Sequence, residues 1–543
     1  MAAVLSTLAS RCPSAGLLAI SIFGPWVIYY IGLVIYRVYF HPLSKFPGPK
    51  LYAASFFPFL WQSMLQGALT KDMLRMHAKY GPVVRVSPNR LMLDAALGYP
   101  LGYDRHTGQD EWAKIPANYG FKKPTALICG PREDHRRQRR LLSHAFSSTA
   151  LKEQEVYLKY YIDLLMVRLR EQAGKDDPID VVKWFNFATF DIIGELAFGE
   201  SFDALKNGMF QPWIANIFTG VRAARLRQFY DHYTFLRPFM PASTKQDMKN
   251  RIEDFRLSSL KAEKRLALKD NTRSDFMTYV LRHFDDEKGM TPDEIKLNSR
   301  TLIAGGSETT ATTLSGFIFH LPKSPQAYRA LADEIRGAFK SEEEITLRTT
   351  DELVYLDACI EETLRVYPPV GEVPGRFCPG AEIDGKWAPA GVSQSCPYEA
   401  LARSLSPSFP AFSNEFGRPH ANHGGDRQTI IGISNWASQR SPLNFRDAEN
   451  FVPERWLPKT HPLYDARYES DNKGAFRPFS AGPRDCIGKN LAYAEVRLVI
   501  TRLLWNFDYE LAEGQDGWLD HQRVYNTYEK GPLLVRLRPR PQK

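Results

Sequence analysis

The longest uninterrupted apolar stretch of the chain lies close to its N-terminus. Residues 17–36 read LLAISIFGPWVIYYIGLVIY and contain no charged side chain. A helix of about 20 apolar residues is long enough to cross the hydrocarbon core of a bilayer. The pattern therefore predicts one N-terminal transmembrane helix over 17–36, with residues 1–16 as a short tail on the far side of the membrane.

The charges around this segment indicate its orientation. Arg37, Lys45 and Lys50 follow it, whereas Arg11 precedes it. Because basic residues accumulate on the cytoplasmic flank of a membrane helix, the body of the protein is expected in the cytoplasm. A cleaved signal peptide is the alternative, but the apolar run is too long for a signal core and no small-residue cleavage pattern follows it.

A proline-containing segment separates the predicted membrane helix from the rest of the chain. Residues 41–51 read HPLSKFPGPKL, and the prolines prevent continuation of a helix. We expect a stiff elbow over 37–51, followed by one large body over 52–543.

Composition narrows the classes of function. Apolar residues make up 44% and charged residues 24% of the chain, as in a globular protein with a large core. The formal net charge is +9, but basic and acidic residues are interspersed, so nucleic-acid binding is not expected. The six cysteines show no paired spacing, which argues against a disulfide framework and against a zinc site.

A loop and a helix are predicted near the C-terminus. Apolar residues recur at helical spacing from Leu491 to Leu503, whereas Gly482 and Gly488 before them favour a loop. Cys486 therefore lies just before the N-terminus of a helix. The helix dipole and nearby amides are expected to lower the pKa of its thiol and favour the thiolate, which is the metal-binding form.

This loop resembles the cysteine signature of the cytochromes P450, F-x-x-G-x-R-x-C-x-G. The matching residues are Phe479, Gly482, Arg484, Cys486 and Gly488. The resemblance implies haem b (iron protoporphyrin IX) with Cys486 as the axial ligand of the iron, and a thiolate ligand favours cleavage of the O–O bond. Gly488 would leave room for the flat macrocycle, and Arg484 would pair with a propionate.

A second matching segment is YLDACIEETLRVYPP, residues 355–369. Glu362 and Arg365 lie one helical turn apart and share a face. Taken alone, such a pair is typical of a solvated surface. The resemblance instead implies the family's E-x-x-R pair, completed by Arg455 of FVPERW, which forms a structural lock behind the haem and does no chemistry.

A third matching segment, residues 298–321, is an apolar stretch interrupted by GGSETT. Each glycine within a helix costs about 1 kcal/mol relative to alanine, so two of them require a reason. The resemblance implies the family's oxygen-binding groove, with Glu308 as the acid that relays protons, Thr309 as the hydroxyl that positions water, and a local opening of the helix. A core helix with satisfied hydroxyls is the alternative.

A fourth segment, PREDHRRQRRLLSHAF, departs from the family pattern W-x-x-x-R. His135 stands in place of the tryptophan, and Arg139 follows four residues later. The resemblance implies that both bind haem propionates, as does Arg376 of VPGRF. The other arginines of the segment, 136, 137 and 140, are predicted to form a solvated face that docks an acidic flavoprotein reductase.

Residues 392–428 do not fit the pattern on either side of them. The segment is rich in serine and proline, has no helical or strand period, and separates GKWAPAG from the predicted strand TIIGISNW. A structureless loop of this length between two strands is uncommon. We hypothesise a translated intron, because Val392-Ser393 can be encoded by a splice donor and Gln428 by an acceptor; a surface insertion is the alternative.

The intron hypothesis predicts which tryptic peptides the purified native protein yields. Peptides that cross a Gly391–Thr429 junction are expected, since splicing would join these residues in one strand. Abundant peptides from within 392–428 would contradict the hypothesis. Mass spectrometry of the digested protein distinguishes the two.

The resemblance covers the chain after the anchor and implies a mainly α fold with a small β region, preceded by one transmembrane helix at the endoplasmic reticulum. It implies insertion of one atom of O₂ into a lipophilic small molecule, with electrons from NADPH through NADPH–cytochrome P450 reductase. The elbow resembles those of filamentous-fungal enzymes that oxidise terpenoids and polyketides. The alternatives are a haem-thiolate isomerase or dehydratase without a reductase, and a non-catalytic haem carrier.

Overall fold

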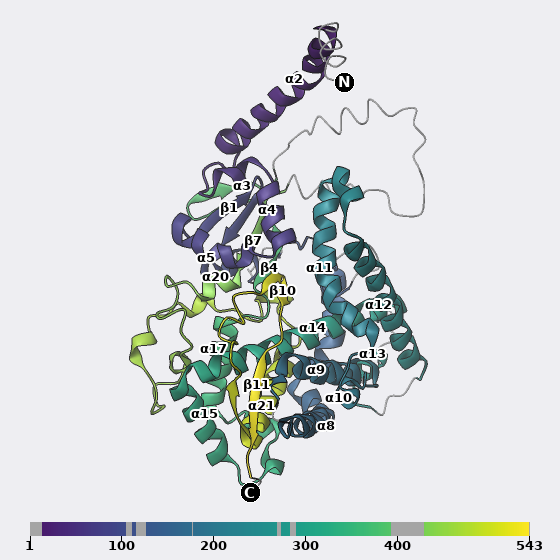
Figure 1. Cartoon of the computed structure of the whole chain (residues 1–543), viewed down its shortest axis with the longest axis vertical. Coiled ribbons are helices and arrows are strands. Elements are labelled where there is room, and N and C mark those ends of the chain that lie inside the picture. Colours follow the sequence, from purple (N-terminus) through teal and green to yellow (C-terminus); the bar gives the residue numbers. More distant parts are fainter. Residues whose placement is uncertain are drawn as a thin grey trace, which may run out of the picture.

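The computed structural model describes most of the chain. The described residues are 13–104, 111–115, 126–175, 177–268, 273–282, 289–391 and 428–541, without the side chains of 13–23 and 212–219. Figure 1 shows a large helical body with a small β region at one end, from which the N-terminal helix projects. The predicted mainly α fold with a small β region is therefore confirmed. Most of the predicted N-terminal tail and almost all of the predicted insertion lie outside the described residues.

The N-terminal apolar segment forms helix α2 (Pro13–Ile35), which continues into one π-helical turn, η1 (Tyr36–Phe40). In the part of the chain that the structure describes, no helix combines the length and the apolarity needed to cross a membrane. The proline-containing elbow is irregular from His41 to Pro49. Its backbone is fixed to the body where the Arg85 amide donates to the Pro47 carbonyl at 2.7 Å.

The main sheet has the strand order β1-β2-β7-β4. Its strands are β1 (Val83–Ser87), β2 (Arg90–Leu93), β4 (Glu372–Phe377) and β7 (Ile430–Ser434). Strand β7 runs parallel to β2 and antiparallel to β4, and all of its residues are buried. The segment predicted as a strand after residue 428 is thus an inner strand of this sheet.

The ends of the predicted insertion lie beside each other. Gly391 and Gln428 form an isolated antiparallel bridge, and the Thr429 amide donates to the Ala390 carbonyl at 3.1 Å. Strand β6 (Lys386–Ala388) pairs with β5 (Ala381–Ile383) in a hairpin. The residues just after β6 are therefore hydrogen-bonded to those just before β7, through contacts that do not involve residues 392–427.

The helical body is built around α14 (Pro292–His320). The other helices of eight or more residues are α5 (Leu69–Tyr80), α6 (Ala95–Gly102), α7 (Arg132–Ser143), α8 (Ser148–Ala173), α9 (Val181–Phe198), α11 (Pro212–His232), α12 (Ala242–Ala267), α15 (Pro325–Ala338), α17 (Val354–Val366) and α21 (Lys489–Asn506). Smaller sheets complete the fold: β3 (Ile179–Asp180) with β11 (Leu534–Pro539) and β8 (Phe507–Leu511), and the hairpin of β9 (Arg523–Tyr525) and β10 (Thr527–Glu529).

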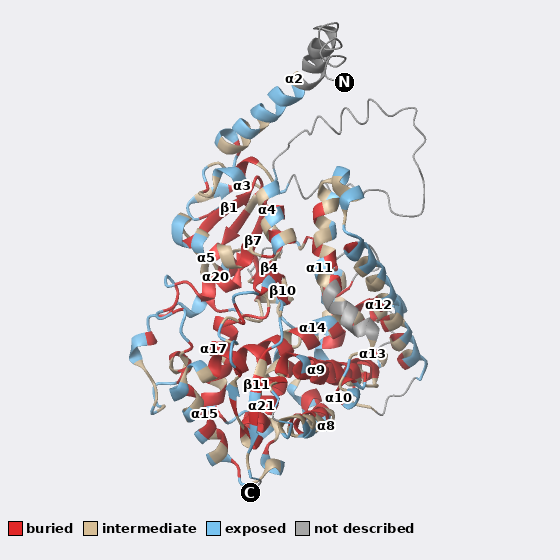
Figure 2. Ribbon diagram, viewed as in Figure 1, coloured by how far each residue is buried: buried red, intermediate tan, exposed pale blue. Residues whose placement is uncertain are grey.

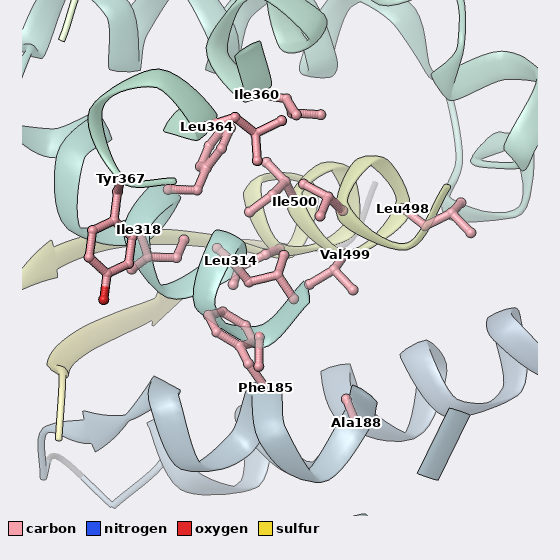
Figure 3. Packing of buried hydrophobic residues seen from close by; sticks show 14 of the residues in the cluster. Phe185, Ala188, Leu314, Ile318, Ile360, Leu364, Tyr367, Leu498, Val499 and Ile500 are labelled. Carbon is pink, nitrogen blue, oxygen red and sulfur yellow. The ribbon is translucent and has the colours of Figure 1, made fainter. Parts of the chain in front are cut away.

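The core forms where α9, α14, α17 and α21 meet. Figure 2 shows these helices as mostly buried, and Figure 3 shows Leu314 of α14 lying between Phe185 of α9 and the apolar side chains of α17 and α21. A Cβ atom on Gly306 would lie 2.6 Å from Ile193 Cδ1 of α9. One of the two glycines in the GGSETT segment is therefore explained by the close approach of two helices.

The predicted local opening of α14 is wrong. The helix is continuous from Pro292 to His320, and Thr291 begins it with a capping box that includes Glu294. The Thr309 hydroxyl donates to the Gly305 carbonyl at 2.6 Å, one turn earlier. This bond to the backbone lies within the regular helical geometry, so the glycines do not break the helix.

Candidate active site

A cavity of about 360 Å³ lies between α14, the C-terminal part of α17, strand β4 and the loop before α21. Its lining is mostly apolar and includes Leu127, Leu302, Leu364, Val370 and Val373. Of the predicted site residues, eight contribute to the lining: Cys486, Arg484, His135, Arg139, Arg376, Phe479, Gly488 and Thr309. The fold thus gathers these eight residues from four separate segments of the sequence around one hollow.

The cysteine loop has a tight backbone that points Cys486 at this cavity. The Cys486 amide donates to the Phe479 carbonyl at 2.9 Å, which closes the loop. Gly482 has φ +72°, and a Cβ atom there would lie 2.0 Å from the Tyr103 carbonyl oxygen. Helix α21 begins at Lys489, as the sequence predicted.

Replacing Gly482 by alanine is expected to displace the cysteine loop. The left-handed backbone alone costs about 1–2 kcal/mol for a residue with a Cβ atom. The contact with Tyr103 adds to this cost, because a carbonyl cannot rotate away as a side chain can. The purified variant should have a much lower ratio of haem absorbance to protein absorbance than the wild type.

A matched control exists for this prediction. Gly514 has φ +80°, and a Cβ atom there would meet no atom within 4 Å. Gly514→Ala therefore carries the backbone cost without the collision. Equal haem content in the Gly482→Ala and Gly514→Ala variants would contradict the steric argument.

The predicted lowering of the Cys486 pKa is wrong for the protein alone. Burial raises the pKa of the thiol above its ordinary value, and the Gly488 amide and the charge of Arg139 only partly offset this rise. In the protein alone, the groups at the helix N-terminus therefore do not outweigh the effect of burial on the pKa of this thiol. A bound metal cation would supply the missing stabilisation, because coordination deprotonates a thiol.

Several cations converge on one side of the cavity. Burial, with the charges of Arg376 and Arg484, lowers the pKa of Lys114 to about 7. Burial, with the charges of Arg484 and Lys114, lowers the pKa of His135 to about 3. Like charges disfavour one another in this way when no anion lies between them. The cluster is therefore suited to a ligand that brings negative charge.

Two of the predicted cations already have carboxylate partners. The Arg484 Nε donates to Glu111 at 2.6 Å, and Arg484 Nη1 donates to the Gly130 carbonyl at 2.9 Å. Arg139 donates to the Asp485 carbonyl at 2.5 Å and to its carboxylate at 2.6 Å. Arg139 thus fixes the residue before Cys486 and braces the cysteine loop.

Sequence reasoning missed Lys114. Its Nζ donates to the Ile128 carbonyl at 2.8 Å, and its backbone forms an isolated bridge with Arg376. The segment around it has no motif and no clear period, so no signal in the sequence pointed to this lysine. Only the folded chain brings it beside a residue 262 positions later.

Glu308 and Thr309 face different surroundings. Thr309 contributes to the cavity lining, whereas Glu308 is buried and is not among the described lining residues. The Glu308 carboxylate instead accepts a hydrogen bond from Lys530 Nζ at 2.5 Å. The predicted pair is therefore divided between two faces of α14.

The predicted structural lock is present and lies outside the cavity. Glu362, Arg365 and Arg455 are buried, and Glu362 Oε1 is 2.7 Å from Arg365 Nη2 while Glu362 Oε2 is 3.1 Å from Arg455 Nε. Trp456 Nε1 and the Val452 amide also donate to Glu362, both within 2.9 Å. These bonds join α17 to the segment around residues 446–456.

The lock extends through the backbone. Arg365 donates to the carbonyls of Gln439, Ala448 and Asn450, each at 2.7–2.8 Å. Arg455 is also paired with the buried carboxylate of Asp471. Glu362 is therefore the anion at the centre of a buried network, as expected of a structural group.

Comparison with known proteins identifies the class. The sequence pattern of the family "Cytochrome P450" matches residues 47–403 and 426–531. A cytochrome P450 monooxygenase of Aspergillus oryzae, aclL, is 38% identical over 522 residues, which cover 94% of this chain and 96% of the relative. The trichothecene C-15 hydroxylase of Fusarium sporotrichioides is 34% identical and covers 95% of this chain and 97% of its own length.

The chain belongs to the cytochrome P450 family. Its relatives of similar length include a further fungal monooxygenase, efuB of Hormonema carpetanum, at 37% identity. The protein is thus a cytochrome P450 monooxygenase that binds haem b through a cysteine thiolate. The family match resumes at residue 426, two residues before the bridge between Gly391 and Gln428.

The residues around the cavity fit this cofactor. Cys486 contributes to the lining, whereas the other cysteines that the structure describes, Cys129, Cys359 and Cys378, do not. A Cβ atom on Gly488 would have Phe146 as its nearest neighbour, at 3.8 Å, which leaves open space beside the cysteine. The pKa values of Lys114 and His135, lowered by burial and then by the like charges around them, fit a site for the two negative propionates that a haem brings.

Proposed function

We propose that Cys486 is the axial ligand of the haem iron and that the enzyme inserts one oxygen atom from O₂ into a lipophilic small molecule. The assignment of Cys486 as the axial ligand is supported by its position. Cys486 contributes to the cavity lining, whereas the other described cysteines do not. When bound, the haem supplies the oxidative chemistry, and the chain supplies orientation, exclusion of water and protons.

The cations around the cavity are proposed to hold the propionates. Lys114, His135 and Arg376 contribute to one region of the lining, and the depressed pKa of Lys114 would return toward its ordinary value beside an anion. Arg484, which has Glu111 as a partner, is the fourth candidate. In this proposal Arg139 acts through Asp485 by fixing the loop that carries Cys486.

Thr309 is the proposed hydroxyl at the cavity end of a proton route. It contributes to the lining, and its hydroxyl donates to the Gly305 carbonyl at 2.6 Å. That bond uses the hydroxyl proton and leaves the oxygen lone pairs directed to accept from a water molecule. Thr309 would thus position water, and Glu308 would supply protons only after its side chain leaves the Lys530 side.

The substrate is proposed to be a terpenoid or polyketide intermediate of fungal secondary metabolism. The described lining is dominated by aliphatic side chains such as Leu302, Leu364 and Val373. Apolar pockets with few polar groups bind ligands of low polarity. One relative, from Fusarium sporotrichioides, is named as a trichothecene C-15 hydroxylase.

A basic face is proposed to receive the electrons of NADPH–cytochrome P450 reductase. Arg136 and Arg140 of α7 are exposed, and Lys489 at the start of α21 is also exposed. Arg137, predicted to belong to the same face, instead pairs with Glu294 at 2.5 Å and serves the fold. Positive surfaces of this kind accelerate association with acidic partners.

We further propose that residues 17–36 anchor the enzyme in the endoplasmic reticulum membrane, with its body in the cytoplasm. Between Val27 and Ile35 of α2, side chains such as Ile28 and Tyr30 are more than half exposed. Phe40 after this helix and Phe239 between α11 and α12 are each more than 70% exposed. Exposed aromatic and aliphatic residues of this kind favour the membrane interface.

One experiment separates this function from its alternatives. Reduced protein with CO is expected to give a thiolate-type Soret shift, and NADPH with reductase is expected to convert a member of a terpenoid and polyketide panel. A haem-thiolate isomerase or dehydratase would show the same shift but form product without NADPH. A haem carrier would form no product under either condition.

A further inference from the structure

Two arginines with little exposure to solvent lie between helix α11 and the main sheet. Arg225 of α11 is 8% exposed, and the side chain of Arg90, the first residue of β2, is 14% exposed. Glu372, the first residue of β4, is the carboxylate that acts on the pKa of both arginines. Helix α11, the main sheet and the short helix α4 (Phe57–Leu60) lie at the end of the body from which α2 projects (Figure 1). These elements therefore enclose two cations and one anion.

The Arg90 guanidinium has weak contacts for a buried group. Its Nη1 lies 3.9 Å from Glu372 Oε1, which is too far for a hydrogen bond, and its central carbon lies 4.6 Å from the centre of the Phe59 ring. Burial lowers the pKa of Arg90 to about 10, and the charge of Glu372 offsets only part of this effect. The guanidinium thus has N–H donors that no described residue uses.

Arg225 is held by neutral groups. Its Nη2 donates to Ser63 Oγ of the π-helical turn η2 (Trp61–Gln66) at 3.0 Å, and its Nη1 donates to Gln228 Oε1 at 3.3 Å. The Arg225 Nε is buried and has no hydrogen-bond partner among the described residues. Burial lowers the pKa of this arginine too. A buried donor without a partner destabilises the fold, so its presence requires a reason.

An arginine that stabilises this fold looks different. Arg365 is fully buried, and its guanidinium donates to the Glu362 carboxylate and to three backbone carbonyls, all within 2.8 Å. Arg90 and Arg225 instead share one carboxylate, to which neither donates a hydrogen bond. Packing and stability therefore do not account for this pair of cations.

The charge and the surroundings of the pair indicate what would bind there. Two guanidinium groups and one carboxylate leave a net charge of one, so a single negative charge would balance the cluster. The neighbouring side chains are apolar: Phe59 lies against Arg90, Met92 follows Arg90 by two residues, and Phe229 follows Arg225 by one helical turn. A carboxylic acid with an apolar body fits both features, whereas a phosphate monoester would bring close to two charges.

The arginine pair lies close to the active-site cavity. Val373, the residue after Glu372, contributes to the cavity lining. Tyr103 also contributes to the lining and is near enough to act on the pKa of Arg90. An acid bound at the arginines would therefore have its apolar part beside a cavity that is itself mostly apolar.

We propose that Arg90 and Arg225 bind the carboxylate of the substrate, so that the enzyme acts on a lipophilic carboxylic acid. The inference rests on the proposed monooxygenase function and names the substrate class of that site. Charge-assisted hydrogen bonds from the two guanidinium groups hold the carboxylate, and they are stronger than bonds between neutral groups. Glu372 is the competing anion and weakens this binding by repulsion.

The test measures binding to the full-length haem enzyme by calorimetry, without NADPH or reductase. The probes are abietic, farnesoic and palmitic acids, each with its methyl ester, which keeps the apolar body and removes the charge. At least one acid is expected to bind about 10–100-fold more tightly than its ester, as is typical of hydrogen bonds to charged groups. No preference for any acid over its ester would overturn the inference.

Three variants and a control assign the preference to these residues. Arg90→Gln and Arg225→Gln should each lose most of the preference for the acid and bind the ester as the wild type does. Glu372→Gln should bind the acid more tightly, because it removes the competing charge; a purely structural role predicts no such gain. Arg348→Gln, at a side chain that is 87% exposed, should change neither affinity. An undiminished preference in both arginine variants, or weaker binding of the acid by Glu372→Gln, would overturn the inference.

Thermal unfolding shows whether Arg225 serves the ligand or the fold. Without ligand, Arg225→Met should melt no lower than the wild type, because it removes a poorly compensated buried charge. The preferred acid should raise the melting temperature of the wild type but not that of Arg225→Met. A marked loss of stability in Arg225→Met without ligand would assign this arginine to the fold and overturn the inference.

Failure of this inference and failure of the proposed function give different results. An enzyme that prefers the acid but forms no product with NADPH and reductase would contradict the monooxygenase function alone. An enzyme that oxidises a lipophilic substrate but binds every acid and its ester equally would overturn the carboxylate site alone.

Discussion

Cys486→Ala is expected to lose the thiolate-type Soret band of the reduced CO complex and all monooxygenase turnover. Cys129 is half-buried, Cys359 and Cys378 are buried, and the described cavity lining includes none of these three. No other described thiol can therefore take the axial position. Thiolate donation is what favours O–O cleavage, so an alanine cannot substitute for it even where haem still binds.

The matched control is Cys129→Ala. Cys129 lies close enough to Lys114 and Arg484 for their charges to offset part of the rise in its pKa that burial causes. It nevertheless does not contribute to the cavity lining. This variant should keep both the spectrum and the turnover. A thiolate-type spectrum that survives in Cys486→Ala, or disappears in Cys129→Ala, would show that the ligand has been assigned to the wrong residue.

Glu362→Ala is expected to prevent stable folding. Glu362 is fully buried and accepts from Arg365, Arg455, Trp456 and the Val452 amide. Its removal would leave two buried guanidinium groups without their shared anion. Breaking a buried ion pair in this way costs about 3–5 kcal/mol, a large part of the stability of an ordinary domain.

The Glu362→Ala variant is expected to have a lower soluble yield and a lower unfolding midpoint in denaturant than the wild type. Glu352→Ala is the control, because Glu352 is 70% exposed and lies 4.0 Å from Arg348. An exposed pair of this kind contributes about 0–1 kcal/mol. Equal unfolding midpoints for Glu362→Ala and Glu352→Ala would contradict a stabilising role of the buried lock.

The same carboxylate gives a pH dependence whose sign follows from its surroundings. Burial raises the pKa of Glu362, but the charges and hydrogen bonds of Arg365 and Arg455 outweigh it and lower the pKa overall. A carboxyl with a depressed folded pKa contributes stability above its unfolded pKa, about 4.3, and loses it as the pH falls through the folded value. The wild type should thus lose stability in acid.

The sequence predicted the parts of the site that lie in short motifs. Cys486 and its loop are separated by a few residues, and Glu362 and Arg365 by one helical turn, so local spacing is enough to place them. The strand at residues 430–434 was also expected, because the segment TIIGISNW resembles a strand of the family. These predictions depend on neighbours along the chain.

Contacts between distant segments could not be predicted in the same way. Lys530 meets Glu308 across 222 residues, and Lys114 meets Arg376 through a bridge between loop and strand. Neither lysine belongs to a periodic pattern that would indicate its partner. The side of α14 that Glu308 faces depends on the packing of α9 and the C-terminal hairpin, which the motif does not encode.

Two wrong predictions share a physical cause. The sequence suggested a lowered thiol pKa at Cys486 because a helix begins after it, but burial has the larger effect. It also suggested an opened helix at residues 305–309, yet the Thr309 hydroxyl bonds to the Gly305 carbonyl within an intact turn. A local motif shows which side chains are present. The packing around them determines the pKa of Cys486 and the backbone conformation of residues 305–309.

The most direct test of monooxygenase chemistry by this chain is turnover under O₂ labelled with heavy oxygen, in the presence of NADPH and reductase. The product is expected to be heavier by one labelled oxygen atom, to form only with NADPH, and to be absent from the Cys486→Ala variant. A product without the label, or one formed equally well without NADPH, would contradict it.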